Sequence, residues 1–79
     1  MNQDEVRGTL QRVFAEVFEG EAFQFSDSLG RENLQAWDSL GHIRLIAATE
    51  DAFDIRFTIE DIENLTSVGR MVARISSSD

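Results

Sequence analysis

The sequence has no cysteine, no proline, no tyrosine and a single histidine. Without cysteine, the 79-residue chain can form neither a disulfide nor a zinc–thiolate site, so its core must be stabilised by apolar packing. Any thiol chemistry would have to come from a group that is added to the chain. The absence of proline is compatible with a helical protein, because proline is the residue that helices tolerate least.

Lysine is also absent, and all seven basic residues are arginine. Fifteen acidic residues outweigh them and give a formal net charge of −8. Such a charge repels nucleic-acid phosphates and anionic lipids, and it attracts basic protein surfaces. The first residues are polar and acidic, and no apolar run is long enough to span a bilayer. We therefore expect a cytoplasmic protein with no signal peptide, no membrane insertion and no nucleic-acid partner.

Apolar residues recur at helical spacing in three stretches of the chain. The predicted helices cover about residues 2–18, 38–53 and 68–75. A chain of 79 residues is long enough for one domain, which we expect to extend over residues 1–79. Three apolar stripes bury one another best in an antiparallel bundle, so the sequence predicts an all-α fold.

Two connecting segments and a tail complete the predicted bundle. Residues 19–37 lack periodicity and form a long loop, which its scattered large apolar side chains can hold against the core. Thr58 and Asp61 match a capping box, so a fourth, short helix is expected to begin there and to end near Leu65. Residues 76–79 are expected to form a frayed tail.

Few residues can support catalysis or bind a metal. His42 is the one imidazole, three residues after Ser39 on the same predicted helix, where both side chains could share a face. A domain of this size has no evident room for a substrate pocket in addition to a catalytic triad. We therefore interpret His42 as a solvated surface residue or as one that contacts a partner. The acidic segments lack the ligand spacing of a calcium loop. We expect no catalytic residue and no metal site.

The segment Asp38-Ser39-Leu40 places a serine beside an acid at the start of a predicted apolar helix. Taken alone, such residues are ordinary helix caps, and their types do not distinguish a cap from a modification site. The pattern downstream of the serine adds Phe53 and the corner Thr66-Ser67-Val68, and it is this longer pattern that carries a resemblance. Over nearly its full length, the chain resembles the acyl carrier protein family, whose Asp-Ser-Leu attachment motif matches Asp38-Ser39-Leu40.

The resemblance implies a bundle with that family's helix layout and a 4′-phosphopantetheine arm on Ser39. A phosphopantetheinyl transferase would take the arm from coenzyme A. The arm would carry acyl groups as thioesters in fatty-acid-like, polyketide or other specialised biosynthesis, and the chain itself would be a non-catalytic phosphoprotein. A second Asp-Ser-Leu-Gly sequence occurs at residues 27–30, but no apolar helix follows it. We therefore favour Ser39 over Ser28.

The resemblance also implies a partner-binding surface, because the family presents acids and a small apolar patch of its second helix to basic surfaces of acyl-loading and acyl-processing enzymes. The candidate residues are Asp38, Leu40, Ile43, Arg44, Ala47, Glu50 and Asp51. Arg44 stands where many fatty-acid carriers have glutamate, and Trp37 also departs from their commonest pattern. These departures predict a specialised, stand-alone carrier with its own partners, which we expect to be monomeric.

Two alternative functions stay open. An aminoacyl or peptidyl carrier, for example of the D-alanyl type, would have the same fold, although Gln35-Ala36-Trp37 lacks the glycine-rich approach that is usual in peptidyl carriers. An unmodified acidic helical interaction module would fit everything except the long-range spacing. A short acyl group could be sequestered by residues that are equally explained as ordinary core, namely Ile46, Phe53, Phe57, Ile62 and Leu65.

Overall fold

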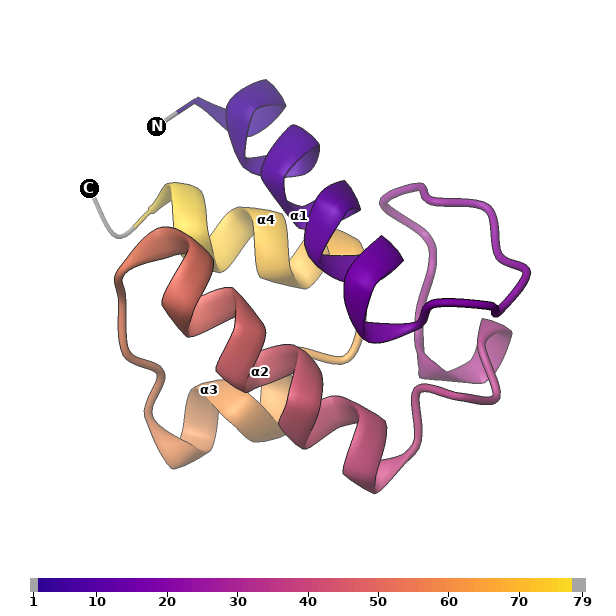
Figure 1. Ribbon diagram of the computed structural model, residues 1–79. Coiled ribbons are helices and arrows are strands. Elements are labelled where there is room, and N and C mark those ends of the chain that lie inside the picture. Colours follow the sequence, from indigo (N-terminus) through magenta and orange to yellow (C-terminus); the bar gives the residue numbers. More distant parts are fainter. Residues whose placement is uncertain (1, 78–79) are drawn as a thin grey trace.

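The computed structural model describes residues 2–77, in which four α-helices form one bundle (Figure 1). The helices are α1 (Gln3–Val17), α2 (Ser39–Phe53), α3 (Ile59–Asn64) and α4 (Val68–Ser76). A short 3₁₀ helix, η1 (Arg31–Asn33), lies in the long connection between α1 and α2. The predicted all-α bundle of three main helices and one short helix, with a long first loop, is confirmed. No helix in the described part is long and apolar enough to cross a membrane.

Each helix begins at a side chain that caps its first backbone N–H groups. At α1, Asn2 Oδ1 accepts a hydrogen bond from the Glu5 N–H at 2.8 Å. At α3, Thr58 and Asp61 form the predicted capping box, in which each side chain accepts a hydrogen bond from the other residue's N–H at 3.0 and 3.1 Å. These local signals explain why the helix starts lie close to their predicted positions.

The core lies between α1, α2 and α4, and α1 packs against both of the other helices. Its fully buried side chains come from all three helices and from the loop before α2. The largest of them are Trp37, Phe14, Leu10, Leu45, Met71, Val6, Val68 and Val72. Burial of a side chain of this size contributes about 1.5–3 kcal/mol to the free energy of unfolding, so packing replaces the disulfides that the sequence cannot form.

Aromatic side chains hold the long loop against the bundle, as the sequence predicted. The Phe14 ring lies 5.2 Å from Trp37 and 5.4 Å from Phe25 between centroids, and both pairs meet edge to face. Phe23 approaches the same ring at 6.3 Å. Phe14 of α1 therefore contacts three aromatic residues that are spread along the loop.

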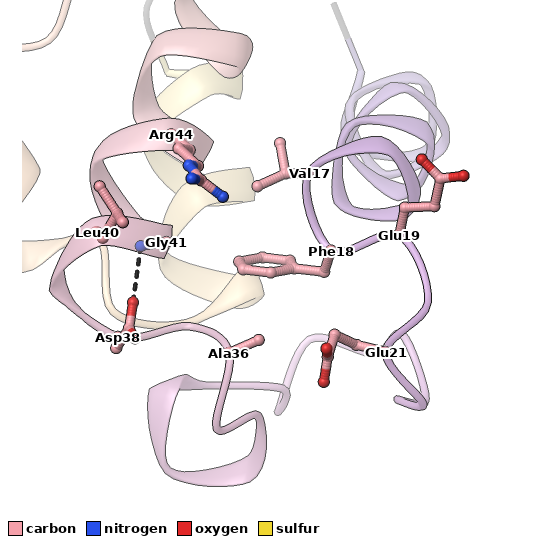
Figure 2. Close-up of a pocket in the computed structure, with 9 residues that line it drawn as sticks. All are labelled: Val17, Phe18, Glu19, Glu21, Ala36, Asp38, Leu40, Gly41 and Arg44. Atoms are coloured by element: carbon pink, nitrogen blue, oxygen red, sulfur yellow. Dashed lines mark hydrogen bonds between the residues drawn. The ribbon is translucent and has the colours of Figure 1, made fainter.

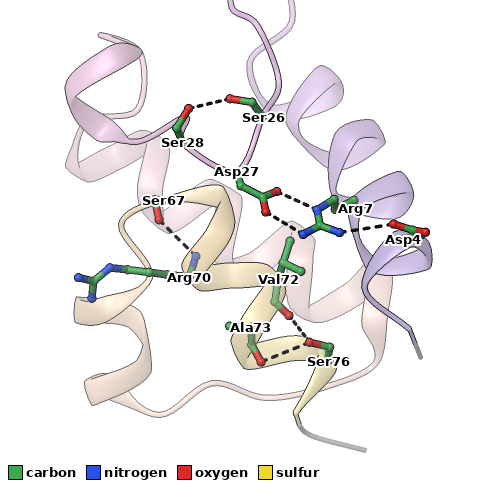
Figure 3. Close-up of polar contacts among 10 residues, drawn as sticks. All are labelled: Asp4, Arg7, Ser26, Asp27, Ser28, Ser67, Arg70, Val72, Ala73 and Ser76. Atoms are coloured by element: carbon green, nitrogen blue, oxygen red, sulfur yellow. Dashed lines mark hydrogen bonds and ion pairs between the residues drawn. The ribbon is translucent and has the colours of Figure 1, made fainter.

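Polar contacts fix the middle of the loop to α1, as Figure 3 shows, and backbone hydrogen bonds fix it to α4. Arg7 Nε and Nη2 donate to the two carboxylate oxygens of Asp27 at 2.8 and 2.7 Å. These hydrogen bonds, and then the positive charge of Arg7, hold the pKa of Asp27 below its ordinary value. The first N–H groups of α4 donate to the same segment, Val68 to the Leu29 carbonyl and Gly69 to the Asp27 carbonyl, both at 2.9 Å.

The short helix α3 is tied to α4 through Arg74. Its Nη2 lies 3.1 Å from Asp61 Oδ2, and its guanidinium stacks over the Phe57 ring with 5.4 Å to the centroid. The pKa of Asp61 is lowered, first by the hydrogen bond from the Thr58 backbone and then by Arg74. A six-residue helix is marginal alone, so these contacts explain how α3 keeps its place.

The C-terminal boundary differs from the expected tail at 76–79. Ser76 is the last residue of α4, and its hydroxyl donates to the Val72 carbonyl at 2.6 Å (Figure 3). The Ser77 N–H still donates to the Ala73 carbonyl at 3.1 Å. The prediction was wrong at Ser76, because a serine hydroxyl can satisfy a helix carbonyl where an apolar pattern has ended. Residues 78–79 lie outside the described part.

Candidate functional site at the start of α2

Ser39 is the first residue of α2 and lies exposed at the surface. The preceding Asp38 is the N-cap, and its Oδ1 accepts a hydrogen bond from the Gly41 N–H at 2.8 Å (Figure 2). Asp38 is therefore engaged in starting the helix. The N–H groups of Ser39 and Leu40 have no acceptor among residues 2–77, and they direct the positive end of the helix toward solvent beside the serine.

The two copies of Asp-Ser-Leu-Gly have different structures. Ser28 lies in the loop, where its Oγ is 3.0 Å from Ser26 Oγ (Figure 3), and it begins no helix. Leu29 is 5 % exposed and belongs to the core, whereas Leu40 is 59 % exposed. The first copy is thus a structural anchor of the loop, and the second presents its serine at a helix start.

His42 is buried, and the expected surface position was wrong. The Trp37 Nε1–H donates to His42 Nδ1 at 2.8 Å, and His42 Nε2 lies 2.7 Å from the Ile62 carbonyl oxygen. Nδ1 accepts a hydrogen bond, and the carbonyl can only accept one. The imidazole must therefore be neutral, with its proton on Nε2. This chain of hydrogen bonds joins the loop before Ser39 to α2 and α3.

The geometry also decides whether Ser39 and His42 could act as a catalytic pair. Both ring nitrogens of His42 are occupied, so neither can take the proton of the Ser39 hydroxyl. Within the described residues, no group of three or more acidic, histidine or cysteine side chains is placed to hold a metal ion.

Gly41 allows the end of the loop to approach the first turn of α2. A Cβ at this position would overlap the Ala36 carbonyl oxygen and would lie 3.1 Å from the Phe18 ring. Any larger residue would push the loop away from α2. Glycine is therefore required here for close contact, although its sequence position gave no sign of this.

A surface hollow of about 280 Å³ lies between the end of α1 and the first turn of α2 (Figure 2). Val17, Phe18 and Leu40 give it apolar walls, and Arg44 lies at its edge. The other lining residues are Glu19, Glu21, Ala36, Asp38 and Gly41. Asp38 and Leu40, on either side of Ser39, thus border a partly apolar recess with an acidic rim.

The residues considered as walls of an acyl cleft lie in the core or against it. Ile46, Phe57 and Leu65 are buried, and Phe53 and Ile62 are partly buried and pack on the core. Their burial is that of ordinary core residues.

Most of the predicted partner residues share one exposed face of α2. Leu40 and Ile43 are 59 % and 63 % exposed. Exposed with them are Asp38, Arg44, Ala47 and Asp51. Glu50 is placed differently, because its Oε2 accepts a hydrogen bond from the Phe57 N–H at 2.8 Å and its Oε1 lies 4.0 Å from Arg56. Its side chain therefore holds the connection between α2 and α3.

The segment that contains this site matches a known family. Residues 33–75 match the model described as the phosphopantetheine attachment site. The chain belongs to that phosphopantetheine-binding carrier family. It is therefore a non-catalytic carrier domain that bears covalent 4′-phosphopantetheine, which phosphopantetheinyl transfer adds.

The start of α2 suits the phosphate of that group. The exposed Ser39 lies beside two N–H groups that have no acceptor among residues 2–77, at the positive end of a 15-residue helix. The arm ends in a thiol, a group that a chain without cysteine does not have. Ser39 would hold the group, and Asp38 and Gly41 keep the helix start in place.

Sequence reasoning missed the bond between Trp37 and His42, although a signal was present. The only tryptophan and the only histidine stand five residues apart, across the start of a predicted helix. Each has a polar ring atom that needs a partner when it is buried. A pair of this kind could have been proposed from the sequence.

We expect Trp37→Phe to lower the free energy of unfolding by about 1–3 kcal/mol, because the buried Nδ1 of His42 loses its donor. Urea unfolding followed by circular dichroism would measure this. The same substitution should cost less in a His42→Ala background, where no Nδ1 is left without a partner. Equal costs in both backgrounds would show that the loss comes from packing of the indole alone.

Proposed function

We propose that the phosphopantetheine arm of this carrier is attached to Ser39 Oγ. The observation that carries the proposal is the matched segment, because residues 33–75 include Ser39 and exclude Ser28. The exposed position of Ser39 on the first turn of α2 supports it as well, since a transferase can reach a hydroxyl there. We propose further that residues 1–79 act as one carrier domain.

The proposed attachment uses Ser39 Oγ as the nucleophile. It attacks the phosphorus that bears the pantetheine of coenzyme A, so that an Oγ–P bond forms and the bond between the two phosphates breaks. The leaving group is 3′-phosphoadenosine 5′-phosphate. The hydroxyl proton passes to a base of the transferase, because His42 has no ring nitrogen to accept it.

We propose acyl groups as the cargo, held as thioesters and delivered to enzymes of fatty-acid-like, polyketide or other specialised biosynthesis. The support is the approach to the serine, Gln35-Ala36-Trp37, which has a buried tryptophan where peptidyl carriers usually have glycines. The domain would contribute by raising the effective concentration of the cargo near each enzyme. An aminoacyl cargo, including D-alanyl, would be recognised from the mass of the native arm.

We propose that partners dock on the exposed face of α2. Leu40, Ile43 and Ala47 offer an apolar patch, and the net charge of −8 attracts basic enzyme surfaces. Arg44 places a positive charge between the exposed acids Asp38 and Asp51 of this face, at the edge of the hollow in Figure 2. A positive charge at this position disfavours enzymes whose docking surface is basic there, which supports a specialised partner set.

The attachment site is tested by intact mass after incubation with coenzyme A and a phosphopantetheinyl transferase of broad specificity. We expect the wild type and Ser28→Ala to gain one phosphopantetheine, and Ser39→Ala to gain none. Circular dichroism would verify that each variant is folded. Modification of folded Ser39→Ala would place the arm on another residue and overturn the assignment.

Partner selection is tested with Arg44→Glu and an acyl-loading enzyme of fatty-acid synthesis that has a basic docking surface. We expect loading to become about fivefold faster at low salt, the effect of about 1 kcal/mol between exposed charges, and the gain to shrink as salt is added. Arg70→Glu is the matched control, because Arg70 is exposed on α4, outside the proposed docking face of α2. An equal gain in both variants would indicate a general charge effect instead.

A further inference from the structure

Arg31 is held close to the start of α2. Its Nε donates to the Trp37 carbonyl oxygen at 3.2 Å, two residues before Ser39. Its own backbone N–H donates to the Thr66 carbonyl at 3.3 Å, so the residue is fixed at both ends. The side chain is half-buried and lines a surface hollow together with Trp37 and Asp38. A positive charge thus lies beside the turn that carries the serine.

The guanidinium of Arg31 has no acidic partner in the described part of the chain. Within residues 2–77, no carboxylate oxygen lies within 4.0 Å of it, whereas Arg7, Arg56 and Arg74 each have one within that distance. The bond to Trp37 uses only the Nε–H. The N–H donors of the Arg31 Nη groups are therefore available to an anion. The net charge of −8 makes most of the surface unfavourable for an anion, so a guanidinium with no carboxylate partner in this part of the chain stands out.

We propose that Arg31 contacts the phosphodiester of the arm and orients its first bonds, an inference that rests on attachment at Ser39. The phosphate would carry one negative charge on two oxygens, which matches the planar fork of a guanidinium. Asp38 and Glu32 border the same hollow and would repel the phosphate. Arg31 offsets that repulsion and favours one direction of the arm over the others.

The experiment compares apo and holo protein by NMR, after intact mass has shown how much of Ser39 is modified. Resonances of the Arg31 guanidinium are followed in the wild type, which requires no substitution. We expect its Nη signals to shift on modification and their exchange with water to slow by up to about fivefold, the range for an exposed ion pair. The guanidinium of Arg12 serves as the internal control and should not change.

The same contact is tested from the side of the phosphate, by comparing its ³¹P resonance in holo variants. The ³¹P resonance of the holo protein should move in Arg31→Gln and stay in place in Arg12→Gln, which removes the same charge from α1. Arg31→Lys keeps the positive charge but loses the planar guanidinium, so its ³¹P resonance should shift by an intermediate amount. Unchanged Arg31 signals on full modification of Ser39 would overturn the contact alone. Absence of any mass gain at Ser39 would overturn the attachment site, and the contact with it.

Discussion

The hydrogen bonds from Trp37 to His42 and from His42 to Ile62 join three segments at the point where α2 begins. Both side chains are buried, so a missing bond would leave a polar ring atom with neither a partner nor water. Ser39 lies between Trp37 and His42 in the sequence, and the structure around it is therefore fixed on both sides. An arm attached there would pivot on a rigid base.

The two copies of Asp-Ser-Leu-Gly have the same sequence, and only their surroundings give them different structures. In the first copy, Asp27 forms an ion pair with Arg7 and Leu29 enters the core. In the second, Asp38 caps α2 and Leu40 faces solvent. The same four residues therefore fasten a loop in one place and expose a serine in the other. What differs is the apolar helix that follows the second copy.

Features that depend on nearby residues were predictable from the sequence. The four helices and the capping box of Thr58 and Asp61 follow from local spacing, and the family resemblance pointed to the segment that the phosphopantetheine attachment family matches. His42 was misplaced because helix periodicity shows which residues share a face, but not that the Trp37 indole and the Ile62 carbonyl meet there. The roles of Arg31 and Gly41 depend in the same way on segments that only the folded chain brings together.

The most direct test of this arrangement is NMR of the His42 ring nitrogens, together with hydrogen exchange of the Trp37 indole N–H, in uniformly ¹⁵N-labelled protein at neutral pH. If His42 links Trp37 to Ile62, the ring is neutral with its proton on Nε2, and the indole N–H exchanges far more slowly than that of an exposed tryptophan. A proton on Nδ1, or an indole N–H that exchanges as fast as an exposed one, would contradict the link on which the geometry around Ser39 depends.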